Sequence, residues 1–273
     1  MRARMKTTKD LIRDIHDDGY CCIPGALSPS QTHLSLDLVL QWLEKMRDKE
    51  AKTVPYLNQN QPMLYNLQNK DARFLELLFS NEQGQAVLRH FLNDEWYKQI
   101  PSDEANYLMR SYLARSSSGA LPMHIDSFVP YSGDHVTIMQ YAMVLEDMNE
   151  EKGCTVIVPG SHKSGTYVTQ EDRSKAIPVI ANAGDLLIWD SRIWHGTTEN
   201  TTDMSRWVLI ATFARWWIKQ AFDIPKALPT SIYETLTDNQ RAIMGYCSTP
   251  YADETEGIDM KRGYDGIERK QAL

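Results

Sequence analysis

The chain has 273 residues, of which 42% are hydrophobic and 24% charged, as is usual for a globular protein with a sizeable core. Its net charge of −7, from 29 basic and 36 acidic side chains, argues against nucleic acid or an anionic membrane as a partner, since both bind clustered cations. No hydrophobic run is long enough for a membrane span or a secretory signal, so neither is expected.

The four cysteines bear on the cellular compartment. Cys21 and Cys22 are adjacent, Cys154 and Cys247 stand alone, and no pair has the spacing of a zinc site. We therefore expect reduced, buried thiols in a cytoplasmic protein.

The N-terminal part, about residues 7–100, is predicted to be mainly helical. Apolar residues at helical spacing predict a helix over 8–18, and Gly19 supplies its end. A short strand is expected over 20–23. A second helix begins near Pro29, where a missing N–H costs little, and runs to about Lys49.

A long segment over 54–69 is polar, aromatic and irregular, and loops of this kind are often functional or are disordered linkers. Residues 73–91 are again predicted to be helical. The tail after Asp223 returns to helix and loop.

From Tyr107 onward the hydrophobic pattern changes to a period of two. Turn signals containing glycine separate six predicted strands: 107–114, 137–145, 154–158, 177–180, 185–189 and 207–216. Several short strands with helices only at the ends predict a sandwich or jelly-roll barrel. With no internal repeat, we predict one domain over 1–273, with its β core at about 105–217 and a tail over 218–273.

Three residues are candidates for a metal site. His124 and Asp126 are two apart, so in a strand they share a face, and His195 follows an apolar strand. Two imidazoles and one carboxylate can hold one face of a ferrous ion and leave positions open for a co-substrate and dioxygen. Alone, the His-x-Asp pair arises often by chance, and His195 could be a hydrogen-bonded histidine at a barrel rim.

Arg206 strengthens the case for a catalytic cavity. It begins a strand whose two faces are both apolar, where a charge is costly unless an anion neutralises it. A carboxylate co-substrate meets that need, and an internal salt bridge is the alternative. Gln140 is similarly polar in an apolar strand, where it either contacts a ligand or bonds a neighbouring backbone group.

In this order, the motifs resemble those of the phytanoyl-CoA dioxygenase family, a branch of the iron(II)- and 2-oxoglutarate-dependent oxygenases. The resemblance covers about residues 10–216 and rests on Asp18-Gly19-Tyr20, Ile23-Pro24-Gly25, His124-x-Asp126, Gly153-Cys154-Thr155, Pro159-Gly160-Ser161-His162, Gly184-Asp185, His195 and Arg206.

The resemblance implies a double-stranded β-helix flanked by helices and a ligand set for iron. His124, Asp126 and His195 would ligate iron(II), Arg206 would bind the distal carboxylate of 2-oxoglutarate, and Thr197 would place a hydroxyl beside that carboxylate. Family relatives that halogenate lack the acidic ligand, so the presence of Asp126 disfavours halogenation.

The expected reaction consumes 2-oxoglutarate and dioxygen, releases succinate and carbon dioxide, and hydroxylates a small organic substrate. Desaturation, cyclisation or epimerisation can start from the same substrate radical. The substrate is expected to resemble a natural product or an amino acid, with a lipid or acyl thioester as second choice. Candidate contacts are Phe128, Tyr131, Trp194, Tyr65, Tyr56 and Asn58.

Two alternatives stay open at this point. One is a cupin-like metalloenzyme, an isomerase or hydrolase, that uses the same ligands without 2-oxoglutarate. The other is an inactive relative that binds a ligand or a protein. The sequence does not indicate an oligomeric state.

Overall fold

The N-terminal elements follow the predicted order. The computed structural model of the protein describes residues 6–46, 62–98, 100–116, 119–250, 253 and 255. Helix α1 (Thr8–Asp18) begins at a capping box and ends at Gly19, whose φ of +89° is accessible to glycine at little cost. Strand β1 (Tyr20–Ile23) and helix α2 (Pro29–Met46) follow as predicted. The predicted end of the second helix, at Lys49, lies outside the described residues.

The described part of the predicted loop over 54–69 contains two short elements. These are strand β2 (Met63–Tyr65) and the 3-10 helix η1 (Leu67–Asn69). Tyr56 and Asn58, expected to contact a substrate, lie outside the described residues.

The stretch predicted to be helical over 73–91 is helical, and it is divided into two helices. Helix α3 (Ala72–Phe79) ends before Asn81, and a second helix, α4 (Glu82–Leu92), begins after it. The side chain of Asn81 accepts a hydrogen bond from the backbone N–H of Gly84 and so caps the start of α4. An asparagine cap satisfies an N–H that the helix itself leaves without a partner, which favours a new helix start at this point.

All six strands predicted beyond Tyr107 are present, and a short one is added. The predicted strands are β3 (Leu108–Arg115), β4 (Ile138–Val144), β5 (Thr155–Ile157), β6 (Ile177–Pro178), β7 (Leu186–Asp190) and β9 (Val208–Ala214). The added strand is β8 (His195–Thr197). Between and after the strands lie η2 (Ser161–Lys163), η3 (Gln170–Lys175), α5 (Ile224–Ala227), α6 (Thr230–Tyr233) and α7 (Asp238–Ile243).

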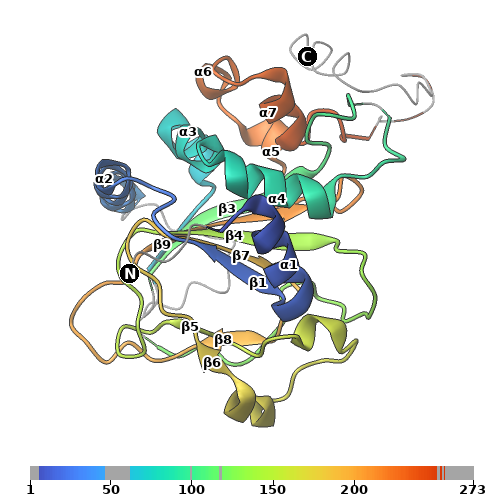
Figure 1. The fold of residues 1–273 in the computed structure, drawn as a ribbon. Helices are drawn as coiled ribbons and strands as arrows, with labels where there is room; N and C mark the ends of the chain where they lie inside the picture. Colours follow the sequence, from blue (N-terminus) through green and yellow to red (C-terminus); the bar gives the residue numbers. More distant parts are fainter. Residues whose placement is uncertain are drawn as a thin grey trace.

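The strands form two facing sheets. The larger is antiparallel, in the order β1-β7-β4-β9-β3-β2, and the smaller has the order β6-β5-β8. Helices α3 and α4 and the C-terminal helices lie on one side of the larger sheet, and the smaller sheet lies on the other side (Figure 1). An antiparallel bridge between His124 and His195 adds one more chain segment beside β8.

Two hydrophobic cores match these layers. The first lies between the helices and the larger sheet and includes Leu88 of α4 and Phe213 of β9. The second lies between the two sheets and includes Ile157 of β5 and Val208 of β9. All seven residues of β4 are buried, as expected of a strand covered on both faces. The architecture is thus mainly β with flanking helices and a double-stranded β-helix, or jelly-roll, core, as predicted.

In the part of the chain that the structure describes, no helix combines the length and the apolar character needed to span a bilayer. The assignment of all 273 residues to one domain stays a prediction.

Candidate active site

A pair of backbone hydrogen bonds brings the two candidate histidines together. The N–H of His124 donates to the carbonyl of His195 at 2.8 Å, and the N–H of His195 donates back to the carbonyl of His124 at 3.0 Å. Residues paired in this way across antiparallel strands project their side chains from the same face. The two ring centroids accordingly lie 4.2 Å apart.

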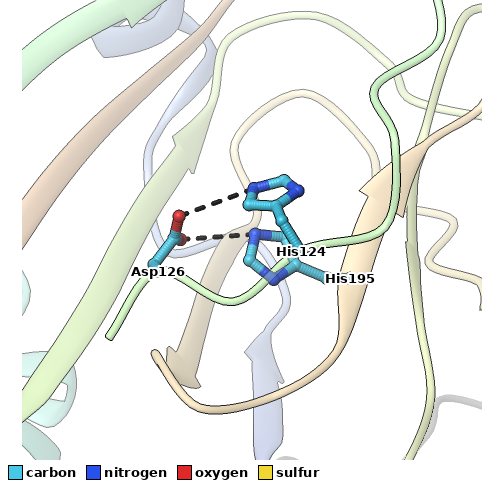
Figure 2. A group of neighbouring side chains, drawn as sticks. All are labelled: His124, Asp126 and His195. Carbon is cyan, nitrogen blue, oxygen red and sulfur yellow. Dashed lines mark ion pairs between the residues drawn. The ribbon is translucent and has the colours of Figure 1, made fainter. Parts of the chain in front are cut away.

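Asp126 completes the group from the turn that follows His124. Its backbone N–H donates to the carbonyl of Ser191 at 2.8 Å, which fixes the turn against the segment before β8. Its carboxylate faces both histidines from one side, with Oδ1 3.5 Å from Nε2 of His124 and Oδ2 3.3 Å from Nε2 of His195 (Figure 2). Ligand atoms of the three residues lie within 4.8 Å of one another, so together they can hold a metal ion.

The hydrogen bonds of the outer ring nitrogens orient both imidazoles. Nδ1 of His124 lies 2.8 Å from the carbonyl oxygen of Pro122, and Nδ1 of His195 lies 3.0 Å from that of Ile193. A carbonyl oxygen only accepts, so each Nδ1 carries the hydrogen and Nε2 is left to face Asp126. This is the arrangement in which a histidine presents an Nε2 lone pair to a metal.

The electrostatics of the group favour a cation beside an ionised carboxylate. Burial would raise the pKa of Asp126, but the charge of His195 and hydrogen bonds from both histidines outweigh it and lower that pKa. Burial likewise would lower the pKa of His124, and the hydrogen bond with Asp126 raises it instead. A metal ion bound by His124, Asp126 and His195 would take the place of the protons in the hydrogen bonds between these residues.

A cavity of about 180 Å³ joins the three residues to Arg206. The side-chain alternation predicted for the run that starts at Arg206 and continues into β9 is correct: Val208, Ile210 and Thr212 line the cavity together with Arg206. Residues of the opposite face, including Phe213, pack in the core beneath the helices. The strand therefore delivers a guanidinium group to the chamber that holds the metal-binding group.

Arg206 is held deep in this cavity, with 2% of its surface exposed. Its Nη1 lies 3.5 Å from Sδ of Met148, and its backbone N–H donates to Oγ of Ser116 at 3.2 Å. Burial, assisted by the positive charge of Arg115, lowers the pKa of Arg206 to about 10. At neutral pH the side chains of Arg115 and Arg206 are still cations, so both would stabilise an anion in the cavity.

Gln140 and Thr197 also line the cavity. Gln140 donates from Nε2 to Oγ of Ser191 at 3.3 Å and accepts from Oγ1 of Thr212 at 2.8 Å. Oγ1 of Thr197 accepts a hydrogen bond from the N–H of Leu121 at 2.9 Å. The amide of Gln140 thus bonds two side chains of the protein, and its contact with a ligand stays a prediction.

The candidate substrate residues divide into two groups. Phe128 and Tyr131 line a second, more open cavity of about 550 Å³. Trp194 donates from Nε1 to the carbonyl of Thr166, and the ring of Tyr65 lies 6.2 Å from that of Phe222. Neither is among the described residues that line the two cavities.

Two arginines on β3 were not singled out from the sequence. Arg115 lines the inner cavity with Leu113, two positions before it, so strand alternation could have placed it there. Arg110 lines the second cavity. No sequence signal indicates the position of Arg110, because it depends on an irregularity in the pairing of β3 with β9.

A jelly roll that brings two histidines, an aspartate and a buried arginine to one cavity defines the class of iron(II)- and 2-oxoglutarate-dependent dioxygenases. Residues 15–208 match the model of the family described as phytanoyl-CoA dioxygenase (PhyH), and the chain belongs to this family. The resemblance read from the sequence is therefore confirmed.

Similar proteins agree with this assignment. Dioxygenase af480 of Aspergillus fumigatus is 23% identical over 94% of this chain and 87% of its own length. HygX of Streptomyces hygroscopicus, solved with nickel and 2-oxoglutarate, has a TM-score of 0.60 at 15% identity, over 78% of this chain and 88% of that one. The epimerase SnoN, solved with Fe3+, alpha ketoglutarate and nogalamycin RO, has a TM-score of 0.59 at 18% identity, over 82% and 91%. These two structures share the fold.

Proposed function

We propose that this protein oxidises a C–H bond of a small organic substrate with dioxygen and 2-oxoglutarate, and releases succinate and carbon dioxide. The observation that carries the proposal is that one cavity is lined both by the His124, Asp126 and His195 group and by Arg206. A metal site without an anion-binding arginine would suit many hydrolases. The combination favours a metal enzyme with an anionic co-substrate.

The donor set fits iron(II). His124 and His195 present neutral Nε2 atoms, Asp126 presents a carboxylate, and a facial set of this kind leaves positions open. When bound, the metal supplies the redox chemistry that couples decarboxylation of 2-oxoglutarate to oxidation of the substrate. The carbonyl groups of Pro122 and Ile193 keep the two rings in the required tautomer and orientation.

The charges in the cavity fit a dianionic co-substrate. A divalent metal, one carboxylate, Arg115 and Arg206 together carry three net positive charges, and 2-oxoglutarate would reduce this to one. Arg206 offers paired N–H donors for the distal carboxylate, and the Thr197 hydroxyl lies in the same cavity. Apolar side chains such as Leu187 and Val208 line the rest and exclude water from the co-substrate.

The substrate is proposed to be a natural product or an amino-acid-like molecule. SnoN, which shares the fold, is described as an alpha ketoglutarate dependent epimerase from nogalamycin biosynthesis, and HygX, which also shares the fold, comes from Streptomyces hygroscopicus. Several relatives similar in sequence are fungal dioxygenases. Hydroxylation is the default outcome, and the same C–H oxidation can lead to desaturation, cyclisation or epimerisation.

The test uses two variants and separates metal binding from co-substrate binding. Asp126→Ala should abolish tight nickel binding, with nickel used as a redox-inert probe. Arg206→Ala should keep nickel binding but weaken 2-oxoglutarate binding by roughly 10- to 100-fold, because charge-assisted hydrogen bonds contribute about 1.5–3 kcal/mol. Titration calorimetry measures both, and succinate release from the iron-loaded protein in air measures turnover.

Matched controls are Asp238→Asn and Arg13→Met, whose side chains are 63% and 66% exposed and should leave all three readouts unchanged. Nickel binding without any 2-oxoglutarate binding would support the isomerase or hydrolase alternative. Binding of both without succinate release, with or without candidate substrates, would support an inactive relative. Unchanged succinate release in either cavity variant would refute the residue assignment.

A further inference from the structure

A second cavity lies beside the metal-binding group. This outer pocket, of about 550 Å³, is lined among others by Arg110, Phe128, Val129, Trp217, Ile218 and Lys219. Two of its lining residues, Ser127 and Phe128, follow Asp126 directly in the sequence. The backbone N–H groups of Asp126 and Ser127 both donate to the carbonyl of Ser191. The side chains of His124 and Asp126 are 37% and 28% exposed, so these two residues of the metal-binding group are not fully buried.

An irregularity in β3 gives the outer pocket its arginine. Met109 pairs with Phe213 and Ser111 pairs with Thr212, so Arg110 is an extra residue in β3 with no counterpart in β9. Such bulges redirect a side chain and often occur beside active sites. Here Met109 packs in the core beneath the helices, while Arg110 lines the outer pocket.

The bulge also shapes the wall of the outer pocket. The carbonyl of Arg110 accepts a hydrogen bond from the N–H of Ala221 at 3.0 Å, so the segment after β9 runs beside it. That segment contributes Trp217, Ile218 and Lys219 to the lining. One backbone feature therefore places a cation and an apolar wall together.

Phe128 covers Arg110 in a strained conformation. Its φ is +65°, in the left-handed region that bulky residues rarely adopt, and the residue is 62% exposed. The backbone is held by a bond from the hydroxyl of Tyr167 to the carbonyl of Phe128 and by one from the hydroxyl of Ser127 to that of Val129. An exposed aromatic ring kept in a strained backbone is a feature of ligand-binding positions rather than of core packing.

The charges in the outer pocket are of one sign. Its described lining contains Arg110 and Lys219 and no aspartate or glutamate, although the whole chain carries a net charge of −7. The guanidinium of Arg110 lies 4.9 Å from the centre of the Phe128 ring. Among the described residues, the ion pairs of the structure do not include Arg110. An anionic group in this pocket would thus meet a cation that has no protein carboxylate bound to it.

Resting on the proposed function, we infer that the substrate is an organic carboxylate with an apolar body, and that Arg110 binds its carboxylate. Phe128, Val129 and Trp217 would contact the apolar body, and the molecule would reach toward the metal past Asp126. A guanidinium binds a carboxylate through two parallel hydrogen bonds, which would fix the orientation of the C–H bond to be oxidised.

The test compares 4-phenylbutyrate with its neutral amide, 4-phenylbutanamide. Both are titrated into protein loaded with nickel and 2-oxoglutarate, so that the inner cavity is filled, and binding is measured by saturation-transfer NMR. The acid should bind the wild-type protein about tenfold more tightly than the amide, as expected for a charge-assisted contact. Arg110→Met should abolish this preference, and Arg110→Lys should keep part of it.

Two further variants separate the contributions. Phe128→Ala should weaken acid and amide to a similar extent and leave the preference unchanged. Arg13→Met, at an exposed position, should change neither. Equal binding of acid and amide to the wild-type protein, or a preference that survives Arg110→Met, would overturn the inference.

The two proposals fail in different ways. Nickel and 2-oxoglutarate titrations of Arg110→Met should match the wild type, because Arg110 does not line the inner cavity. If the wild-type protein does not bind 2-oxoglutarate, the proposed function is refuted. The acid preference, measured again in the Arg206→Ala background, would still test the outer pocket on its own.

Discussion

Replacing Gly196 by alanine should disturb the candidate metal centre without touching a ligand. Gly196 lies between His195 and Thr197 in β8, where the segment before His124 approaches closely. A Cβ at this position would lie 2.8 Å from the carbonyl oxygen of Leu121 and 3.2 Å from that of Pro122. Carbon and carbonyl oxygen atoms normally approach to about 3.3 Å, so the two segments must separate by about half an ångström.

The cost follows from what these segments hold. Overpacking of a well-packed site costs about 1–3 kcal/mol of the free energy of unfolding. The same separation would stretch the two backbone hydrogen bonds that place His124 opposite His195. Disturbed support of metal ligands typically weakens metal binding by roughly 10- to 100-fold.

The assay combines urea unfolding, followed by circular dichroism, with calorimetric titration of nickel. Gly119→Ala is the matched control, because a Cβ at Gly119 has no atom within 4 Å. We expect Gly196→Ala to unfold at lower urea and to bind nickel more weakly than the control. If both variants have the same midpoint and the same nickel affinity, the contact between β8 and the segment before His124 does not position the ligands.

Three other predictions follow. Leu88→Ala should lower the free energy of unfolding by about 2–5 kcal/mol, whereas Leu34→Ala, at a position 57% exposed, should change it by less than about 0.5 kcal/mol in the same urea titration. Arg192→Met should lower the free energy of unfolding by about 3–5 kcal/mol, because it leaves Asp190, only 1% exposed, as a buried charge without its partner. Replacing Asp190 by leucine in the same protein should recover part of this loss. Burial raises the pKa of the Cys22 thiol to about 11. In a variant whose other three cysteines are replaced by serine, the alkylation rate of Cys22 should therefore rise tenfold per pH unit up to about pH 11. A plateau of that rate near pH 9 would contradict this prediction.

The sequence predicted strands best where side-chain alternation is strong. In the strand that begins after Arg206, alternate residues face the cavity and the core beneath the helices, as expected from the pattern alone. The alternation also extends to Arg115 in β3, which could have been recognised from Ser111 and Leu113. Local pattern is sufficient here because each face packs against a different layer.

Elements that depend on distant partners were harder to predict. Strand β8 is three residues long and contains Gly196, so it has little intrinsic preference for a strand. It forms because its neighbours on both sides, β5 and the segment at His124, supply hydrogen bonds. The break at Asn81, by contrast, was visible in the sequence as a capping residue inside an otherwise helical pattern.

The grouping of His124, Asp126 and His195 could be predicted as a hypothesis from residue types and order, but not from local geometry. The bridge between the two histidines is a single residue pair, fixed by the register of the smaller sheet. Arg110 shows the same limit more sharply, because a bulge arises from the pairing of two strands and leaves no local sequence signal.

The bulge lets one strand supply a cation to each of two cavities, and this division can be tested by deleting Arg110. Without that residue, β3 could pair with β9 in a regular register, because the pairs on both sides of it are already continuous. Arg115 would keep its place in the inner cavity, so nickel and 2-oxoglutarate should bind as in the wild-type protein, while the preference for 4-phenylbutyrate over its amide disappears. The lost hydrogen bond from Ala221 should cost only about 0.5–1.5 kcal/mol of the free energy of unfolding. Loss of 2-oxoglutarate binding in a folded deletion variant would instead mean that the bulge also fixes the inner half of β3, and the two cavities would then not be independent.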